Sequence, residues 1–182
     1  GRIMSRRSSN VERTRWTVGL LDLQPHHHVL ELGYGPGLGL VAAANDATSG
    51  RVVGIDHSTT MQAMAQRRVR RAGVAERVDL LTGDVTESLP AGIGPFDAIF
   101  CCNVWQFWQE QFTVIERLAD HLSAGGVLAI THQPRNDGAD RAQAMRSAEQ
   151  LTEQMIAAGL ASPVTHALEL QPVPAVCVTA RR

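Results

Sequence analysis

The chain has 182 residues, of which 44% are hydrophobic and 19% charged, and its formal net charge at pH 7 is −1. This length fits one domain whose core needs no disulfide or metal, and the balanced charge argues against a dedicated nucleic-acid-binding protein. No apolar run approaches the roughly 18 residues of a membrane span, and the first residues lack the apolar core of a signal peptide. Three cysteines, two of them adjacent, form no disulfide framework. These features together predict a cytoplasmic protein.

Short apolar segments alternate with amphipathic segments along the chain. The predicted elements are, in order, a helix over 10–23 with Asn10 as its N-cap, a strand at 28–32, a helix at 38–45, a strand at 51–55, a helix that follows Ser58 and ends at Gly73, strands at 78–81 and 96–102, a helix over 112–122 that stops at Gly125 and Gly126, a strand at 127–131, a helix over 140–158, and closing strands at 164–170 and 175–179. This alternation predicts an α/β fold with a doubly wound, mostly parallel sheet and helices on both faces.

Ligands of such sheets bind beyond the carboxyl ends of the strands. The segments that follow the predicted strands are therefore the candidate site, and they are residues 33–37, 56–58, Asp84, residues 103–108 and His132.

The first of these segments is rich in glycine. Gly33, Gly35 and Gly37 alternate with other residues, and Glu31 precedes them in an E-x-G-x-G-x-G pattern. Leu38 stands where a dinucleotide fingerprint requires glycine, which disfavours an NAD-dependent oxidoreductase. A carboxylate at Glu31 suits a ligand that carries an ammonium group better than one that carries a pyrophosphate.

With these residues, the sequence resembles the class I S-adenosylmethionine-dependent methyltransferases from Val29 to the C-terminus. The motifs that carry the resemblance are VLELGYGPG at 29–37, VGID at 53–56, GD at 83–84, FDAIF at 96–100 and LSAGGVL at 122–128. The resemblance implies a seven-stranded sheet in the order 3-2-1-4-5-7-6 with the last strand antiparallel. It also implies a Rossmann-like methyltransferase domain at 25–182, to which residues 1–24 add an N-terminal helical segment.

The resemblance implies S-adenosylmethionine as the cofactor. Its methionine part would be held by Glu31 and by the backbone of Gly33, Gly35 and Gly37. Asn103 would lie near the methionine amine and the departing methyl group.

The adenosine part would lie further along the same edge. Asp56 follows the second strand, at a spacing from the glycines that suits a bond to the ribose hydroxyls. The resemblance places His57 and Met61 against the adenine, Asp84 on its amino group, and the backbone of Val85 beside it.

Sulfonium methyl transfer depends mainly on positioning, and it needs a base only when the nucleophile carries a proton of high pKa. His132 is the candidate base, because an imidazole ordinarily titrates near neutrality, and Asn103 is the second candidate catalytic residue. Trp105 and Trp108 either stack a planar acceptor or pack under their loop. Trp16 would join the acceptor site if the N-terminal segment closes as a lid, and would otherwise pack at the sheet edge.

The sequence therefore predicts methyl transfer to a small-molecule acceptor by in-line displacement. One alternative is an RNA or ribosomal methyltransferase, which the arginine runs at 2–15 and 67–71 favour and the net charge disfavours. The other is a non-catalytic module that binds S-adenosylmethionine. The three histidines at 26–28 lie at the opposite edge of the first strand and are expected to form a solvated turn, so no metal site is predicted.

Overall fold

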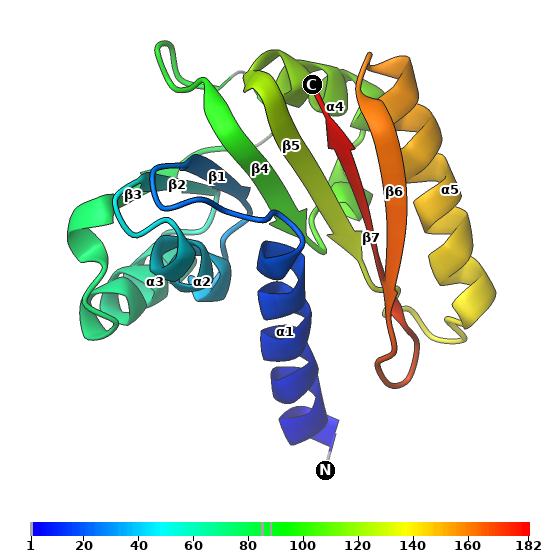
Figure 1. Ribbon diagram of the computed structural model, residues 1–182. Helices are drawn as coiled ribbons and strands as arrows, with labels where there is room; N and C mark the ends of the chain where they lie inside the picture. The colour runs from blue at the N-terminus through cyan, green and yellow to red at the C-terminus, as the bar shows by residue number, and fades with distance from the viewer. Residues whose placement is uncertain (1, 85, 88) are drawn as a thin grey trace.

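Seven strands form one sheet in the order β3-β2-β1-β4-β5-β7-β6 (Figure 1). The computed structural model describes residues 2–84, 86, 87 and 89–182, with side chains from residue 9 onward. The strands are β1 His28–Leu32, β2 Arg51–Asp56, β3 Val78–Thr82, β4 Phe96–Cys102, β5 Leu122–His132, β6 Ala161–Leu168 and β7 Ala175–Arg181. Strands β1 to β5 are parallel, and β7 runs antiparallel to both β5 and β6. The predicted strand order and the antiparallel last strand are confirmed.

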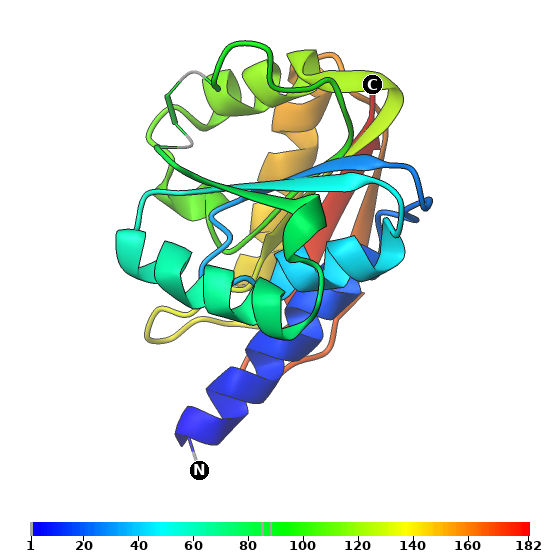
Figure 2. The same ribbon diagram turned by 90° about the vertical axis from the view of Figure 1, so that its left-hand side faces the viewer.

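Helices cover both faces of the sheet (Figures 1 and 2). The helices are α1 Arg2–Gly19, α2 Leu38–Asp46, α3 Thr59–Arg71, α4 Gln111–Asp120 and α5 Arg141–Ala157, and short 3-10 turns lie at Ala75–Arg77 (η1) and Trp105–Phe107 (η2). Val29 packs in the core on the side of α1, α2 and α3, whereas its neighbour Leu30 packs on the side of α4 and α5. Because both faces are buried, Val29, Leu30 and Leu32 of β1 are apolar, and Glu31 is buried among them.

The first helix is longer than predicted. It begins at Arg2, so the prediction of Asn10 as its N-cap is wrong. The side chain of Asn10 instead accepts a hydrogen bond from Arg13, one turn further along. No glycine or proline interrupts residues 2–9, and arginine favours helix, so nothing local ends the helix there. In the part of the chain that the structure describes, no helix has the length and apolar character to cross a membrane.

The fifth strand is also longer than predicted. Helix α4 ends at Asp120, and Gly125 and Gly126 lie inside β5 rather than stopping the helix. The β4–β5 register shifts at this point, Gly125 has a φ of 78°, and a Cβ on Gly126 would lie 2.9 Å from the Ser123 carbonyl oxygen. The glycines thus form a bulge, which needs the positive φ of Gly125 and the small size of Gly126.

Helix α1 packs against the sheet through a polar face. Its Thr17 hydroxyl lies 2.7 Å from the hydroxyl of Thr131 in β5 and accepts a hydrogen bond from the Cys102 thiol at the end of β4. The N-terminal half of α1 projects past the sheet edge (Figures 1 and 2). The described part of the helix is therefore a wall beside the carboxyl ends of β4 and β5, and closure over a cofactor stays a prediction.

Candidate active site

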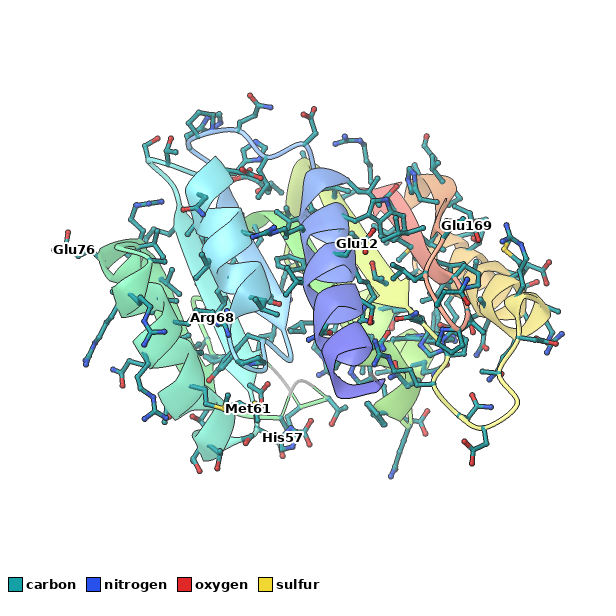
Figure 3. All side chains as sticks on the ribbon, turned by 90° about the horizontal axis from the view of Figure 1, so that it is seen from below. Glu12, His57, Met61, Arg68, Glu76 and Glu169 are labelled. Carbon is teal, nitrogen blue, oxygen red and sulfur yellow. The ribbon has the colours of Figure 1, made fainter. Side chains whose placement is uncertain are left out.

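The carboxyl ends of β1 to β5 meet at one edge of the sheet because these strands are parallel. Figure 3 views the molecule from this edge, with α1 crossing between His57 and Met61 on one side and Glu169 on the other. The segments singled out in the sequence are thus brought together along one edge.

The glycine loop after β1 depends on backbone conformations that favour glycine. Gly33, Gly35 and Gly37 have φ values of 65°, 51° and 81°. A Cβ on Gly33 would lie 2.5 Å from the Val104 Cγ2 atom, in the loop after β4, whereas a Cβ on Gly35 would meet nothing within 4 Å. Gly33 therefore permits close packing of two loops, and Gly35 borders open space where a ligand can approach the backbone.

Glu31 is a buried carboxyl group behind this loop. It is 3% exposed, and among the described residues its Oε2 atom has no hydrogen-bond partner. A Cβ on Gly39, in the first turn of α2, would collide with Oε1. Burial raises the pKa of Glu31 well above its usual range, although a hydrogen bond from the Leu40 backbone N–H offsets part of this effect. A buried acid without a full set of partners fits a site that receives an ammonium group.

Asp56 organises the loop from the end of β2. Its Oδ2 atom accepts a hydrogen bond from the Gly35 backbone N–H at 2.8 Å, and its Oδ1 atom accepts one from the Ser58 backbone N–H at 2.9 Å. Each carboxylate oxygen can accept a further hydrogen bond, so the group also suits ribose hydroxyls. The predicted role as a ribose ligand therefore comes with a structural role that the sequence did not reveal.

The start of α3 lies beside Asp56. Ser58 caps the helix as predicted, since its Oγ atom accepts a hydrogen bond from the Met61 N–H at 3.3 Å. His57 is exposed and Met61 half-buried at this point (Figure 3). Within the second arginine run, Arg68 donates through Nε to the Pro36 carbonyl oxygen at 2.8 Å and so braces the glycine loop.

Asp84 is exposed after β3. Its Oδ1 atom accepts hydrogen bonds from the Thr86 backbone N–H at 2.8 Å and the Thr86 hydroxyl at 2.7 Å. These bonds lower the pKa of Asp84, and His57 makes a smaller contribution in the same direction. The charges of Asp84 and His57 thus interact weakly, and the contact of both residues with the adenine stays a prediction. Val85, the predicted backbone contact, lies outside the described residues.

Asn103 joins the ends of β4 and β5. It has a φ of 56°, which asparagine tolerates better than most residues. Its Oδ1 atom accepts a hydrogen bond from the Gln133 N–H at 2.7 Å, and its Nδ2 atom donates to the Gln133 carbonyl oxygen at 3.3 Å. Because Val104 touches Gly33, this clamp links the glycine loop to the end of β5.

His132, the candidate base, is buried at the end of β5 against the ring of Trp105. Gln106 donates through Nε2 to the Asn103 carbonyl oxygen at 2.9 Å, which turns its Oε1 atom toward His132 Nδ1 at 3.3 Å. This arrangement places the imidazole proton on Nδ1, and among the described residues the Nε2 lone pair has no hydrogen-bond partner. Burial, and secondarily the charge of Arg13, lowers the pKa of His132 to about 4. The expected titration near neutrality is wrong, because a charged imidazole is poorly solvated here.

The aromatic residues after β4 lie in two different environments. Trp105 and Trp108 are buried in the core, and the Trp105 Nε1–H donates to Gln154 of α5 at 3.0 Å. The structure therefore favours packing under the loop over stacking of an acceptor. Phe107 is 76% exposed in the same loop. Trp16 is half-buried and packs against the core on the side of α2, so its contact with an acceptor stays a prediction.

Sequence reasoning missed several residues of this edge. Gln106 and Gln133 each neighbour a predicted site residue, and their place in the segments after β4 and β5 was the available signal. Arg13 gave a weaker signal, because a single arginine in an arginine-rich helix is usually solvated. It is 3% exposed and donates to the Gln133 Oε1 atom at 2.6 Å.

The strand order, the glycine loop and its buried acid define a class I S-adenosylmethionine-dependent methyltransferase. Residues 29–126 match the model of the methyltransferase domain family. The chain belongs to this family, and S-adenosylmethionine is its cofactor.

Individual relatives agree with this assignment. The chain is 29% identical over 175 residues to the uncharacterized methyltransferase YdaC of Bacillus subtilis (strain 168), covering 96% of this chain and 94% of the relative. It is 34% identical over 128 residues to the trans-aconitate 2-methyltransferase of Azoarcus sp. (strain BH72), covering 69% of this chain but only 47% of that relative, about half its length. The crystal structure of a SAM-dependent methyltransferase from Aquifex aeolicus has the same fold, with a TM-score of 0.73, 20% identity, and coverage of 92% of this chain and 88% of that one.

Proposed function

We propose that the chain transfers the sulfonium methyl group of S-adenosylmethionine to a small-molecule acceptor by in-line displacement. The observation that carries the proposal is the buried Glu31 carboxyl group, whose Oε2 atom has no partner among the described residues, directly behind the open glycine loop. When bound, the cofactor supplies a methyl group already activated on sulfur. The protein's own residues therefore need to position the reactants more than to activate them.

Each residue of the edge has a proposed task. Glu31 binds the ammonium group and gains the partner that it lacks. Asp56 accepts hydrogen bonds from the ribose hydroxyls while it holds Gly35, and Asn103 keeps the loop after β4 in register with β5. His57, Met61, Asp84 and Val85 surround the adenine.

His132 is the proposed proton acceptor for a protonated acceptor atom. A pKa of about 4 makes it a weak base, so it does not remove the proton of an alcohol in advance. An alcohol oxygen becomes strongly acidic once the methyl group has begun to bond to it, and the Nε2 lone pair can then take the proton.

The acceptor class and the setting of the reaction are also proposals. A relative named for trans-aconitate supports a small-molecule acceptor, and Arg68 of the second arginine run donates a hydrogen bond to the glycine loop. The bacterial relatives support a bacterial source, and the three free cysteines support a reducing cytoplasm.

The decisive experiment titrates S-adenosylhomocysteine into the protein by calorimetry. We expect binding that strengthens as the pH rises, because Glu31 must lose its proton to pair with the ammonium group. Glu31→Gln should weaken binding at least tenfold and remove this pH dependence, since about 1.5–3 kcal/mol is typical of a hydrogen bond to a charged group. Glu76→Gln, at an exposed position of η1 (Figure 3), is the control. Absence of binding to folded wild-type protein would refute the proposal.

A further inference from the structure

A cavity of about 490 Å³ opens at the carboxyl end of β5, beyond the cofactor-binding residues. Its lining comes from α1, from the loop between β5 and α5, and from the loop between β6 and β7. The described residues that line it are Ser9, residues 133–139, Gln171 and Pro172. Three segments distant in sequence thus enclose one space beside the site.

Two arginines meet at the wall of this cavity. Arg135 lines it and donates through Nη2 to the Gln133 Oε1 atom at 3.0 Å, and the buried Arg13 donates to the same oxygen through Nη1 at 2.6 Å. The Gln133 Nε2 atom donates to the Val173 carbonyl oxygen at 2.8 Å, which keeps Oε1 turned toward both guanidinium groups. Two positive charges therefore converge on one neutral oxygen.

Arg13 has no carboxylate to balance its charge. Among the described residues, no Asp or Glu forms an ion pair with it, and its Nε atom is buried without a hydrogen-bond partner. The side chains that the structure does not describe include no Asp or Glu. Burial, with a contribution from Arg135, lowers the pKa of Arg13 to about 10, so it is still charged at neutral pH. A buried cation of this kind is costly unless an anion comes close to it.

The cavity adjoins the methyl-transfer site. The side chain of Asn103 is hydrogen-bonded to the Gln133 backbone, and Val104, the residue after Asn103, packs against Gly33 of the glycine loop. Asn103 and Val104 thus connect the wall of the cavity to the glycine loop, which is proposed to hold the methionine end of the cofactor. One acidic residue, Asp137, is among the described residues of the lining; it is exposed, as Arg135 is, so solvent and salt screen both charges. The buried Arg13 is screened less, and its positive charge has no buried acidic counterpart among the described residues of the lining.

We propose that this cavity binds a carboxylate group of the methyl acceptor, with Arg135 as the contact residue and Arg13 as the positioning residue behind Gln133. The Nη2 atom of Arg135 donates to Gln133 Oε1 at 3.0 Å and to the Ser9 hydroxyl at 3.3 Å. A carboxylate that takes the place of the Ser9 hydroxyl would meet the planar guanidinium in a two-point hydrogen bond. Arg13 adds positive charge from the interior and holds the Gln133 side chain in place. The acceptor is then an organic acid whose reactive atom extends toward the glycine loop. This inference rests on the proposed function and specifies its acceptor.

The test is a calorimetric titration of protein already saturated with S-adenosylhomocysteine, at fixed ionic strength. The probes are succinate, citrate, trans-aconitate and the uncharged trimethyl ester of trans-aconitate. We expect at least one of the three acids to bind, the ester to bind at least tenfold more weakly than its parent acid, and Arg135→Gln to weaken acid binding at least tenfold. Arg135→Lys keeps the positive charge but not the planar guanidinium, so its affinity for the acid should lie between that of the wild type and that of Arg135→Gln. Arg146→Gln, at an exposed position of α5, is the matched control.

The results separate the two proposals. Failure of S-adenosylhomocysteine to bind refutes the proposed function. If it binds but none of the acids does, or if Arg135→Gln binds them as tightly as the wild type, the carboxylate site is refuted alone. Arg13→Gln should weaken acid binding and leave S-adenosylhomocysteine binding intact, which a general loss of structure would not do. If that variant does not fold, Arg135→Gln decides the question.

Discussion

Replacement of His132 with asparagine should remove a pH-dependent part of the protein's stability. Asparagine keeps a nitrogen near the position of Nδ1 for the bond to Gln106, but it has no imidazole to titrate. The pKa of His132 is lowered from 6.5 to about 4 in the folded protein, by burial first and by Arg13 second. The unfolded chain solvates this imidazole and binds its proton at higher pH than the folded chain does.

The sign and size of the effect follow from this difference. Well above pH 6.5 the imidazole is neutral in both states and has no effect on the pH dependence. As the pH falls from 6.5 toward 4, the unfolded state binds the proton first, so the free energy of unfolding decreases. The full difference corresponds to about 3 kcal/mol, since one pKa unit is worth about 1.4 kcal/mol. About 2 kcal/mol of it is already lost at pH 4.5.

The measurement is urea unfolding of the wild type and of His132→Asn between pH 7.5 and 4.5. We expect the stability of the wild type relative to the variant to fall by about 2 kcal/mol across this range. His26→Asn, at an exposed position in the turn before β1, is the control and should leave the pH dependence unchanged. If the difference between the wild type and His132→Asn is the same at all pH values, His132 does not have a lowered pKa, and the proposed weak-base role loses its basis.

The remaining predictions concern the cofactor edge. Asp56→Asn places an amide N–H₂ against one of two backbone N–H donors, and it should weaken S-adenosylhomocysteine binding at least tenfold in calorimetry. The control is Asp79→Asn, at a half-exposed residue that pairs with Arg51. Equal affinity of the wild type and both variants would mean that Asp56 only organises the turn. Gly33→Ala should cost about 2–4 kcal/mol in chemical denaturation, because left-handed strain adds to a clash with the loop after β4. The Cβ added by Gly35→Ala would meet nothing within 4 Å, so this variant should lose no more stability than Gly73→Ala, at a glycine that also has a positive φ and free space around it. Gly35→Ala should nevertheless weaken cofactor binding. Equal cofactor binding by Gly35→Ala and the wild type would contradict a cofactor contact at this loop.

The sequence by itself determined the parts of the site that depend on neighbouring residues. The glycine loop, the acid two residues before it and the acid at the end of β2 can be read from short patterns because local backbone conformation restricts them. The bounds of β1 and β4 agree with the structure for a similar reason, since strands buried on both faces are mainly apolar on both sides, here interrupted only by Glu31 and Asp97 after the first residue. The strand order followed from the family resemblance rather than from the residues alone.

Only the tertiary structure decided the chemical state of the side chains. Burial lowers the pKa of His132 and raises that of Glu31, and burial depends on segments that meet only after folding. The same holds for the aromatic residues, because one short loop turns Trp105 into the core and Phe107 into solvent. Arg13 and Gln133 are 120 positions apart and share a hydrogen bond. Local pattern cannot predict such contacts, because they depend on how α1 packs across the ends of β4 and β5.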